Sequence, residues 1–308
     1  MSEILSFLKN VDANKKKPVD PISEIETSTE KSSGQDDSEE LFHEQKLNRS
    51  ESTAQLQRTL NPGTIPGEQF RTELDFDLSK STVQLQRALD PGTILGEQFR
   101  ILRTRLSLLQ KQNGIRTILI TSTVPNEGKS FTSHALAGVI AQEQGKRVVI
   151  IDADLRKQGS GREYGLALSG EFNGTTQVLQ ETSEFQKSLI KLNNPEFWFL
   201  PSGTLPPNPS ELLSSPEMEK MLGFAAEKFD WVIVDAPPAL ALSDPCLIAP
   251  LCDGVVFVVR ANSTPAKLAQ DAINKVGRER ICGIVLNRKK QIHSSRHYYQ
   301  YYNYQKQK

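Results

Sequence analysis

The sequence is poor in cysteine and has no long apolar run, and both absences exclude whole classes of protein. Its 308 residues include only Cys246, Cys252 and Cys282, and no two of them have CxxC spacing. We therefore expect neither a disulfide framework nor a zinc site, and we expect a reducing cytosol as the compartment. No stretch approaches the roughly eighteen consecutive apolar residues of a membrane-spanning helix. The first residues contain no basic segment followed by an apolar one, so we expect no secretory signal.

Tyrosine is almost absent until the C-terminal end of the chain. Of six tyrosines, one is Tyr164 and the other five fall within the last eleven residues: Tyr298, Tyr299, Tyr301, Tyr302 and Tyr304. Charge is distributed just as unevenly. The 37 basic and 37 acidic residues cancel overall, yet the stretch from Arg288 to Lys308 holds six basic residues and no acidic one. We predict that residues 291–308 form a flexible, basic, tyrosine-rich tail.

The N-terminal third is polar and contains an internal repeat. Residues 1–52 are rich in Lys, Glu, Ser and Asp, and such a segment buries too little apolar surface to offset the entropy of ordering, so we expect it to be disordered. Residues 53–71 (TAQLQRTLNPGTIPGEQFR) recur as residues 82–100 (TVQLQRALDPGTILGEQFR), with fifteen of nineteen positions identical. Only the second copy continues into an amphipathic helical run. We therefore expect the folded domain to begin with the second copy, and the first copy to lie in a linker, residues 53–81.

From Gly114 onward the sequence alternates between short apolar runs and helical segments. The predicted strands are 117–121, 147–152, 197–200, 231–235, 254–259 and 282–287. The predicted helices are approximately 129–144, 210–228, 241–250 and 264–277. Near-continuous apolar strands separated by helices indicate a doubly wound, mainly parallel α/β sheet. We predict that residues 82–290 form this domain, and that the carboxyl ends of its strands share the edge where ligands bind.

The first predicted strand leads directly into TSTVPNEGKSF (121–131), which has the pattern of a P-loop with Thr123 in place of the usual first glycine. Lys129 is placed to contact β- and γ-phosphate oxygens and Ser130 to ligate Mg²⁺, while Gly128 leaves room for the anion. Backbone N–H groups of the loop and the N-terminus of the following helix complete the phosphate site. The predicted nucleotide-binding residues of this loop are Pro125, Asn126, Glu127, Gly128, Lys129, Ser130 and Phe131.

Three aspartates end buried strands, where packing gives no reason for them. Asp152 and Asp154 lie in VVIIDADLR, and Asp235 ends WVIVD before Ala-Pro-Pro. At the carboxyl edge they would reach a metal–phosphate complex, because Mg²⁺ takes few protein ligands beside water and phosphate oxygens. The predicted metal ligands are Ser130, Asp152 and Asp235, and the predicted catalytic residues are Lys129, Asp152, Asp154 and Asp235. Each aspartate could instead cap a following helix, an alternative that is weak for Asp235 and stronger for Asp154.

These motifs resemble those of the cytoplasmic kinase domain of the bacterial tyrosine kinases of capsule and exopolysaccharide biosynthesis, within the wider ParA/MinD-like P-loop ATPases. The resemblance runs from about Glu97 to the end of the chain. PNEGKS resembles the Walker A motif with Asn126 where glycine is usual, IIDADLR resembles the second motif, Walker A′, and VIVDAPP resembles Walker B. The resemblance implies ATP and Mg²⁺ as cofactors. It also implies that Asp152 or Asp154 orients or deprotonates the attacking tyrosine hydroxyl, and that Asn287 of GIVLN contacts adenine.

The same resemblance implies phosphoacceptors, subunit contacts and partners. The tyrosines of the tail match the family's autophosphorylated cluster, and Glu97, Arg100 and Arg103 match an ExxRxxR element that mediates contacts in ring-like oligomers. The first copy of the repeat has Leu74 where this element has its last arginine. The implied partners are a membrane activator of the polysaccharide chain-length regulator (co-polymerase) type, further copies of this chain, and a cognate tyrosine phosphatase, with no nucleic acid expected. The implied location is the cytoplasm, at the inner face of the membrane through that partner.

The residues of the tail lead to the same hypothesis without the resemblance. Clustered tyrosines in a basic terminal segment could stack on nucleic-acid bases, anchor at a membrane interface, or accept phosphate. The upstream phosphate site favours the third. The leading hypothesis is an ATP-dependent protein-tyrosine autokinase that phosphorylates its own C-terminal cluster and regulates exopolysaccharide or capsule polymerisation and export. Two alternatives stay open: a ParA/MinD-like ATPase switch for positioning or partitioning, and a non-catalytic nucleotide-sensing scaffold for a membrane complex.

Overall fold

A computed structural model of the chain describes residues 75–157, 161, 164 and 172–288. The predicted disordered region, the first copy of the repeat and the tyrosine-rich tail lie outside these residues. The described residues contain an eight-stranded sheet in the order β1-β4-β5-β3-β6-β2-β7-β8, in which only β4 and β5 pair antiparallel. The strands are β1 (Asp75–Asp77), β2 (Thr117–Ser122), β3 (Val148–Asp152), β4 (Ile190–Asn193), β5 (Phe197–Leu200), β6 (Trp231–Asp235), β7 (Gly254–Arg260) and β8 (Ile281–Asn287).

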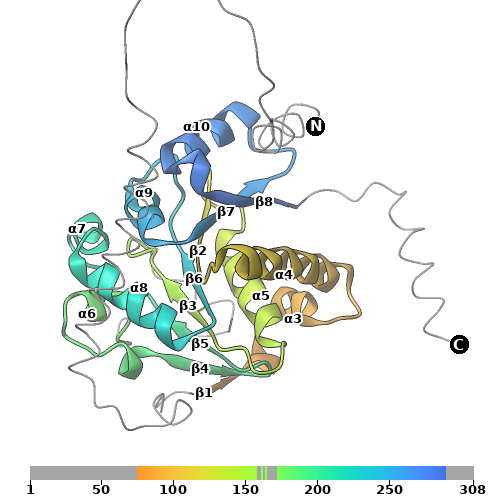
Figure 1. Cartoon of the computed structure of the whole chain (residues 1–308), viewed down its shortest axis with the longest axis horizontal. Coiled ribbons are helices and arrows are strands. Elements are labelled where there is room, and N and C mark those ends of the chain that lie inside the picture. Colours follow the sequence, from red (N-terminus) through yellow and green to blue (C-terminus); the bar gives the residue numbers. More distant parts are fainter. Residues whose placement is uncertain (1–74, 158–160, 162–163, 165–171, 289–308) are drawn as a thin grey trace, which may run out of the picture. The chain divides into compact units, whose positions relative to one another are not determined.

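Helices cover both faces of this sheet (Figure 1). One face carries α3 (Val83–Leu89), α4 (Ile94–Asn113) and α5 (Lys129–Ala141). The other carries α6 (Thr175–Leu179), α7 (Pro209–Leu213), α8 (Pro216–Lys228), α9 (Asp244–Ile248) and α10 (Ala266–Val276). Short 3₁₀ turns are η1 (Leu78–Lys80), η3 (Gln186–Ser188), η4 (Ala249–Leu251) and η5 (Arg278–Arg280). None of the helices in the described ranges is long and apolar enough to cross a lipid bilayer.

Burial on both faces explains why the central strands read as continuous apolar runs. Every residue of β2, β3 and β6 is buried. Successive side chains of a strand point to opposite faces, so in β2 Ile118 and Ile120 join the core beneath α4 and α5, while Leu119 joins the core beneath α8. The prediction of a doubly wound, mainly parallel sheet is confirmed. The six predicted strands correspond to β2, β3, β5, β6, β7 and β8.

The fold departs from the predicted elements at several places, and the short helices α3 and α6 were not predicted. The predicted helix 210–228 is two helices, α7 and α8, separated at Ser214 and Ser215. Pro216 begins α8, and its ring fixes φ and removes an N–H donor, which suits the first residue of a helix and not its interior. The strands β1 and β4 were not predicted. The strand β1 has three residues and lies in the predicted linker, and β4 (IKLN) alternates apolar and polar residues instead of forming an apolar run.

The second copy of the repeat, residues 82–100, forms α3, a turn and the start of α4. The hydroxyls of Thr82 and Thr93 each accept a hydrogen bond from the first turn of the helix that follows, which fixes where α3 and α4 begin. Leu89 lies so close to α5 that a Cβ atom on Gly138 would be 2.5 Å from its Cδ2 atom. The repeat unit therefore packs directly on the helix that follows the P-loop.

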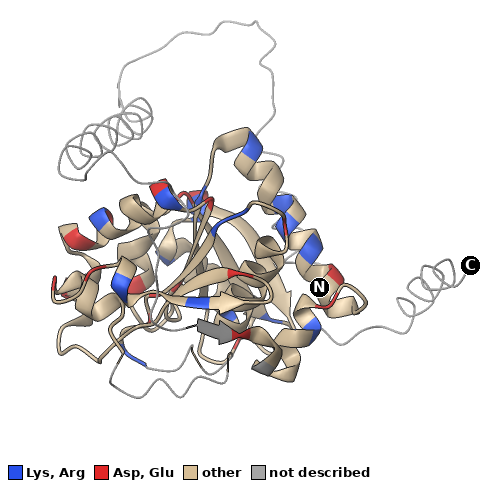
Figure 2. Ribbon diagram, turned by 90° about the horizontal axis from the view of Figure 1, so that it is seen from below, with Lys and Arg blue, Asp and Glu red and all other residues tan. Residues whose placement is uncertain are grey.

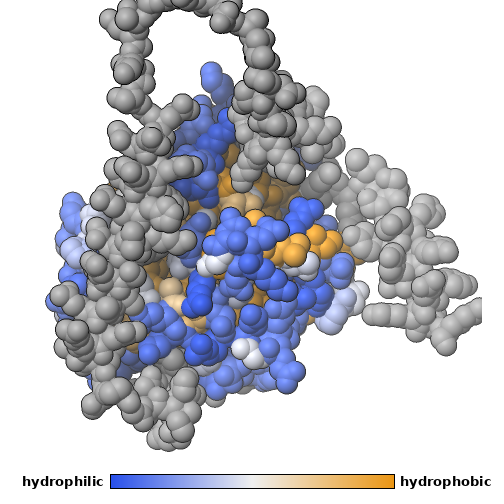
Figure 3. Space-filling view, viewed as in Figure 1, coloured by the Kyte–Doolittle hydropathy of each residue, from blue (hydrophilic) through white to orange (hydrophobic). Residues whose placement is uncertain are grey.

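The helix α4 contains more basic than acidic residues. The helix carries Arg100, Arg103, Arg105 and Lys111 against a single acid, Glu97. Figure 2 shows how basic and acidic residues are distributed over the ribbon. The same helix exposes two large apolar side chains, Ile101 and Leu108, with 44% and 53% of their surface accessible. In the space-filling view, hydrophobic residues show among hydrophilic ones in this part of the molecule (Figure 3).

Candidate active site

Three central strands bring the predicted catalytic groups to one edge of the sheet. β6 lies between β3 and β2, and all three run parallel. Asp152 at the end of β3 is therefore in register with Asp235 at the end of β6. The P-loop connects the end of β2 to α5, whose first residue is Lys129. Groups that are more than a hundred residues apart in the sequence thus meet because parallel strands end together.

The P-loop backbone alternates in handedness near its tip. Asn126 and Gly128 both have positive φ angles, of 65° and 93°. Asparagine is one of the few residues that adopt the left-handed conformation readily, which explains how Asn126 can occupy a position where glycine is usual. Alternation of this kind turns successive N–H groups toward one side and forms an anion-binding nest. Gly128 is also the N-cap of α5 and supplies no side-chain acceptor, so the N–H groups of the first turn are available to a phosphate.

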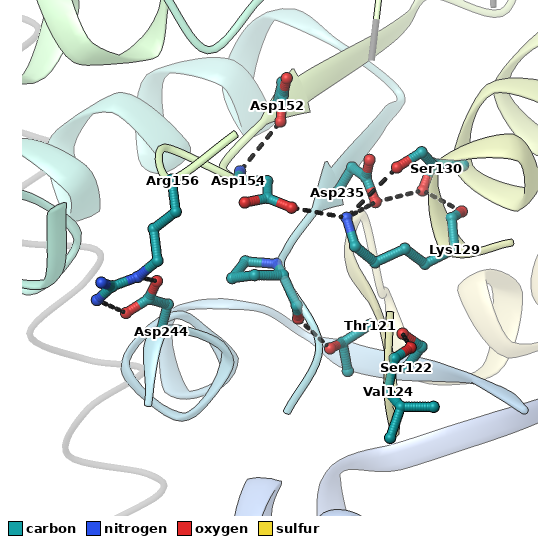
Figure 4. Close-up of polar contacts among 12 residues, drawn as sticks. Thr121, Ser122, Val124, Lys129, Ser130, Asp152, Asp154, Arg156, Asp235 and Asp244 are labelled. Atoms are coloured by element: carbon teal, nitrogen blue, oxygen red, sulfur yellow. Dashed lines mark hydrogen bonds and ion pairs between the residues drawn. The ribbon is translucent and has the colours of Figure 1, made fainter. Parts of the chain in front are cut away.

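The ammonium group of Lys129 lies between two carboxylates (Figure 4). Its Nζ atom is 3.2 Å from Oδ2 of Asp154 and 3.4 Å from Oδ1 of Asp235. The hydroxyl of Ser130 is 3.3 Å away. Burial by itself lowers the pKa of Lys129, but the charges of Asp235, Asp154 and Asp152 outweigh it, so the pKa is raised above the usual value. Lys129 therefore stays cationic at neutral pH, as a phosphate ligand must.

Asp235 is fully buried and only half satisfied. Its Oδ1 atom accepts a hydrogen bond from the hydroxyl of Ser133 at 3.3 Å, in addition to the contact with Lys129. Its Oδ2 atom has no hydrogen-bond partner. A buried carboxylate oxygen without a partner is costly unless water or a cation reaches it. Ser133, one turn beyond Ser130 on α5, was not predicted, because a serine inside an apolar helix carries no motif of its own.

The residues present fit a magnesium ion held mainly by phosphate and water. Asp235 offers the unpartnered buried oxygen, and Ser130 offers a hydroxyl at the start of α5. Asp152 ends the neighbouring strand, where its Oδ1 atom accepts the N–H of Asp154 at 3.0 Å. Among the described residues there is no group of three or more His, Cys, Asp or Glu side chains that could hold a metal. Mg²⁺ does not need such a group, since it usually keeps several waters and binds one or two carboxylates with substrate phosphates.

The alternative role of Asp154 as a helix cap does not hold. Residues 153–157 form a turn and irregular backbone. The side chain of Asp154 is directed at Lys129 (Figure 4). No helix follows Asp235 directly either, because residues 236–238 are irregular. Both aspartates therefore belong to the same polar cluster as the P-loop lysine.

A second ionic cluster holds the segment after β3. Arg156 donates to both carboxylate oxygens of Asp244, at 2.7 and 3.0 Å, and Asp244 is fully buried (Figure 4). The hydroxyl of Ser210 accepts from Arg156 at 2.7 Å and donates to Asp244 at 2.9 Å. The hydrogen bonds to Asp244 raise the pKa of Arg156. The cluster fastens the IIDADLR motif to α7 and α9. Sequence reasoning missed Asp244 and Ser210, because they lie 88 and 54 residues from Arg156.

Asn287 lies against the P-loop. Its Nδ2 atom donates to the backbone carbonyl of Glu127 at 2.7 Å, and its Oδ1 atom accepts the N–H of Arg288 at 2.8 Å. A Cβ atom on Gly128 would lie only 2.1 Å from Nδ2 of Asn287. The end of β8 thus meets the P-loop, and the contact of Asn287 with adenine stays a prediction. The five tail tyrosines lie outside the described residues.

The predicted oligomer-contact residues lie away from this cluster, on α4. Arg103 donates to the carbonyl of Val139 at 3.1 Å and pairs with Glu143 at 3.0 Å. Arg100 lies 3.4 Å from the side-chain oxygen of Gln142. Both arginines therefore engage the C-terminal end of α5 of their own chain, and Glu97 is exposed.

Comparison with known proteins places this site in a family. A family model described as an AAA domain matches residues 115–269. The tyrosine-protein kinase YwqD of Bacillus subtilis (strain 168) is 36% identical over 203 residues, which cover 65% of this chain and 84% of that protein. The tyrosine-protein kinase etk of Escherichia coli (strain K12) is 34% identical over 191 residues, which cover 61% of this chain but only 26% of that protein.

Two solved structures are similar over most of their length. The chimerical protein CapA2B2 superposes with a TM-score of 0.62 at 27% identity, covering 72% of this chain and 97% of that one. The kinase domain of Escherichia coli tyrosine kinase ETK superposes with a TM-score of 0.61 at 26% identity, covering 75% and 98%.

A P-loop before α5, whose lysine contacts aspartates at the ends of neighbouring parallel strands, defines a P-loop nucleotide-binding enzyme. The matched AAA domain contains the P-loop and all three aspartates, and runs from two residues before β2 into the first turn of α10. Together with YwqD, this assigns the chain more closely. It belongs to the bacterial tyrosine-protein kinases.

Proposed function

We propose that this chain transfers the γ-phosphoryl group of ATP to tyrosines of its own C-terminal cluster, and that the modification regulates polymerisation and export of a capsule or exopolysaccharide. The observation that carries the proposal is the position of Lys129, held between Asp154 and Asp235 at the P-loop. In the same chain, five of six tyrosines stand together at one end. The proposed kinase domain extends to residue 290 and the substrate tail is residues 291–308, after a disordered region 1–52. Residues 75–81, which the sequence placed at the end of the linker 53–81, belong to the domain, because β1 pairs with β4 and Leu78 is buried in the core.

The proposed roles of the site residues follow from their contacts. Lys129 moves from its carboxylates onto β- and γ-phosphate oxygens when ATP binds, with the N–H groups of residues 126–131 around the phosphates. Ser130, Asp152 and Asp235 hold Mg²⁺, which would neutralise charge on the transferred phosphoryl group. Asp154 or Asp152 orients the attacking tyrosine hydroxyl and accepts its proton. Asn287 contacts the base.

The composition of the tail supports its role as a substrate. Clustered tyrosines beside six basic residues have no packing purpose at a chain end. Each phosphotyrosine adds nearly two negative charges at neutral pH. Modification of the cluster would turn a basic segment into an acidic one, and neighbouring subunits that carry it would repel each other.

The proposed assembly is a ring-like homo-oligomer beneath a membrane partner. Glu97, Arg100 and Arg103 form the proposed subunit contact, on a helix that exposes Ile101 and Leu108. A membrane protein of the polysaccharide co-polymerase type recruits the chain to the inner face of the membrane, and a cognate tyrosine phosphatase reverses the modification.

The decisive experiment is incubation of the full chain with Mg·ATP followed by intact-mass measurement, with Lys129→Met as the control. Phosphate additions to the wild type and none to Lys129→Met are the expected result. ATP hydrolysis with an unchanged mass would contradict the proposal and would favour the ATPase switch.

Transfer between subunits is tested by mixing two variants. Lys129→Met with an intact tail is combined with an otherwise wild-type chain whose five tail tyrosines are replaced by phenylalanine. Phosphate on the Lys129→Met chain supports transfer to a neighbour. In a separate control, the wild-type chain by itself should become phosphorylated. If it does and the Lys129→Met chain in the mixture does not, transfer is restricted to the same chain.

A further inference from the structure

Glu127 is the one acidic residue of the P-loop, and its side chain points into the protein. It is only 1% exposed, although it lies between Asn126 and Gly128 at the turn of the loop. Its Oε2 atom accepts the N–H groups of Thr123 and Val124, at 2.6 and 3.0 Å. One carboxylate oxygen therefore fastens the beginning of the loop to its middle.

The other carboxylate oxygen fastens the loop to β7. Oε1 of Glu127 accepts the N–H of Arg260 at 3.0 Å and the hydroxyl of Thr264. An ionised carboxylate is an acceptor only, and here four donors converge on it from two segments. Hydrogen bonds to an ionised acceptor are about twice as strong as neutral ones. The buried charge is compensated, and the compensation requires the loop and residues 260–264 to keep one arrangement.

A second hydrogen bond reaches the same residue from β8. Nδ2 of Asn287 donates to the carbonyl of Glu127, and the carbonyl of Asn287 accepts the N–H of Ala261 at 2.8 Å. The ends of β7 and β8 are thus joined to each other and to the loop. A glycine suits position 128, because its φ of 93° strains other residues and a Cβ atom there would displace the Asn287 amide.

We propose that Glu127 is a positioning residue that holds the P-loop in its phosphate-binding shape through these four hydrogen bonds, with Asn287 as a second brace. Nucleotide then binds without first ordering the loop, so its binding free energy is not spent on that ordering. The inference rests on nucleotide binding, which is part of the proposed function, and not on transfer of phosphate to tyrosine.

The test is a graded series of full-length variants whose affinity for ADP in the presence of Mg²⁺ is measured by titration calorimetry. Thr264→Val removes one donor, and we expect binding about threefold weaker. Glu127→Gln keeps the shape, but its amide N–H₂ must face one donor pair. The Thr264 hydroxyl can reverse to accept from it, whereas the Arg260 N–H cannot, so we expect about tenfold weaker binding. Glu127→Ala removes all four bonds and should be weaker still.

Glu219→Gln is the matched control, since it removes the same charge from an exposed position on α8 and should bind ADP as the wild type does. If Glu127 had a purely structural role, its substitution would lower the melting temperature but leave the affinity of the folded protein for ADP unchanged. Wild-type affinity in folded Glu127→Ala and Thr264→Val would therefore overturn the inference. If the glutamate variants do not fold, an unchanged affinity in Thr264→Val alone overturns it. A wild-type chain that binds no ADP would instead contradict the proposed function.

Discussion

The two ends of α5 meet opposite kinds of partner. At its first turn, the N-cap Gly128 offers no side-chain acceptor, and the loop before it is braced by Glu127 from behind. At its last turn, Arg103 donates to the carbonyl of Val139 and pairs with Glu143. The positive end of a helix favours an anion and the negative end favours a cation. Arg103 is the cation at the C-terminal end of α5, and the N-terminal end stays available for phosphate. We therefore assign nucleotide binding to the N-terminal end of α5 and a contribution to stability to its C-terminal end.

The largest expected effect comes from removing the cation at the phosphate end. Lys129→Met should reduce phosphate incorporation by about a hundredfold or more, the size typical of losing one group that stabilises developing charge. Incorporation measured by intact mass over time checks this. Incorporation near the wild-type rate would contradict the role assigned to Lys129.

The next largest effect is expected on ADP affinity in Gly128→Ala, and a control variant separates the shape of the P-loop from backbone strain. In Gly128→Ala the new Cβ would lie 2.1 Å from the Asn287 amide, and the residue has a φ of 93°. We expect binding of ADP about tenfold weaker or more. The matched control is Gly145→Ala, with a φ of 77° and no atom within 4 Å of the added Cβ. Gly145→Ala introduces only the backbone strain, which should lower the free energy of unfolding by about 1–2 kcal/mol. Its ADP affinity should be unchanged. An equal loss of ADP affinity in Gly128→Ala and Gly145→Ala would contradict this prediction.

A smaller effect is expected at the other end of α5. Arg103→Ala removes a hydrogen bond to the last turn of the helix and an ion pair with Glu143, both partly exposed. We expect a loss of about 1 kcal/mol in the free energy of unfolding, with no change in ADP affinity. Denaturant unfolding measures the loss of stability, and titration calorimetry measures the ADP affinity. Arg105→Ala, exposed on the same helix, is the control and should change neither. A strong loss of ADP affinity in Arg103→Ala would show that the two ends are not separable.

The smallest effect at neutral pH concerns His134, inside α5 between the two ends. It is fully buried against Tyr164, and burial first, then the charge of Lys129, lowers its pKa to about 3. Between pH 6.5 and 3 the unfolded chain binds a proton that the folded chain does not, so this residue makes stability fall as the pH drops through that window. Unfolding measured across pH should be less steep there in His134→Asn, whatever its absolute stability. An unchanged slope would contradict the assignment.

The phosphate end of α5 was largely predictable from the sequence, and the opposite end was not. A P-loop is a contiguous motif, so Lys129 and Ser130 are visible within a few letters. Asp152 and Asp235 are visible because each ends an apolar run, and parallel strands bring such ends together. The doubly wound sheet followed from the same runs.

Contacts between distant residues could not be read in this way. Arg103 matches a motif of charged residues, but its partners Val139 and Glu143 stand 36 and 40 positions further on and have no pattern of their own. The side chain of Glu127 was predicted only as part of the loop. Two of its four partners, Arg260 and Thr264, lie more than a hundred residues away, at and just beyond the end of β7. Almost any residue can donate a backbone N–H, so the residue type at a donor position does not reveal such a hydrogen bond in the sequence.

The most direct test of the central claim is a phosphopeptide map of the full chain after incubation with Mg·ATP. Tyr164 serves as an internal negative control, because it is only 3% exposed and packs against Phe197 and Phe199. We expect phosphate on the tyrosines at 298–304, none on Tyr164, and none anywhere in Lys129→Met. ATP consumption by the wild type with no phosphate on the tail would contradict the claim.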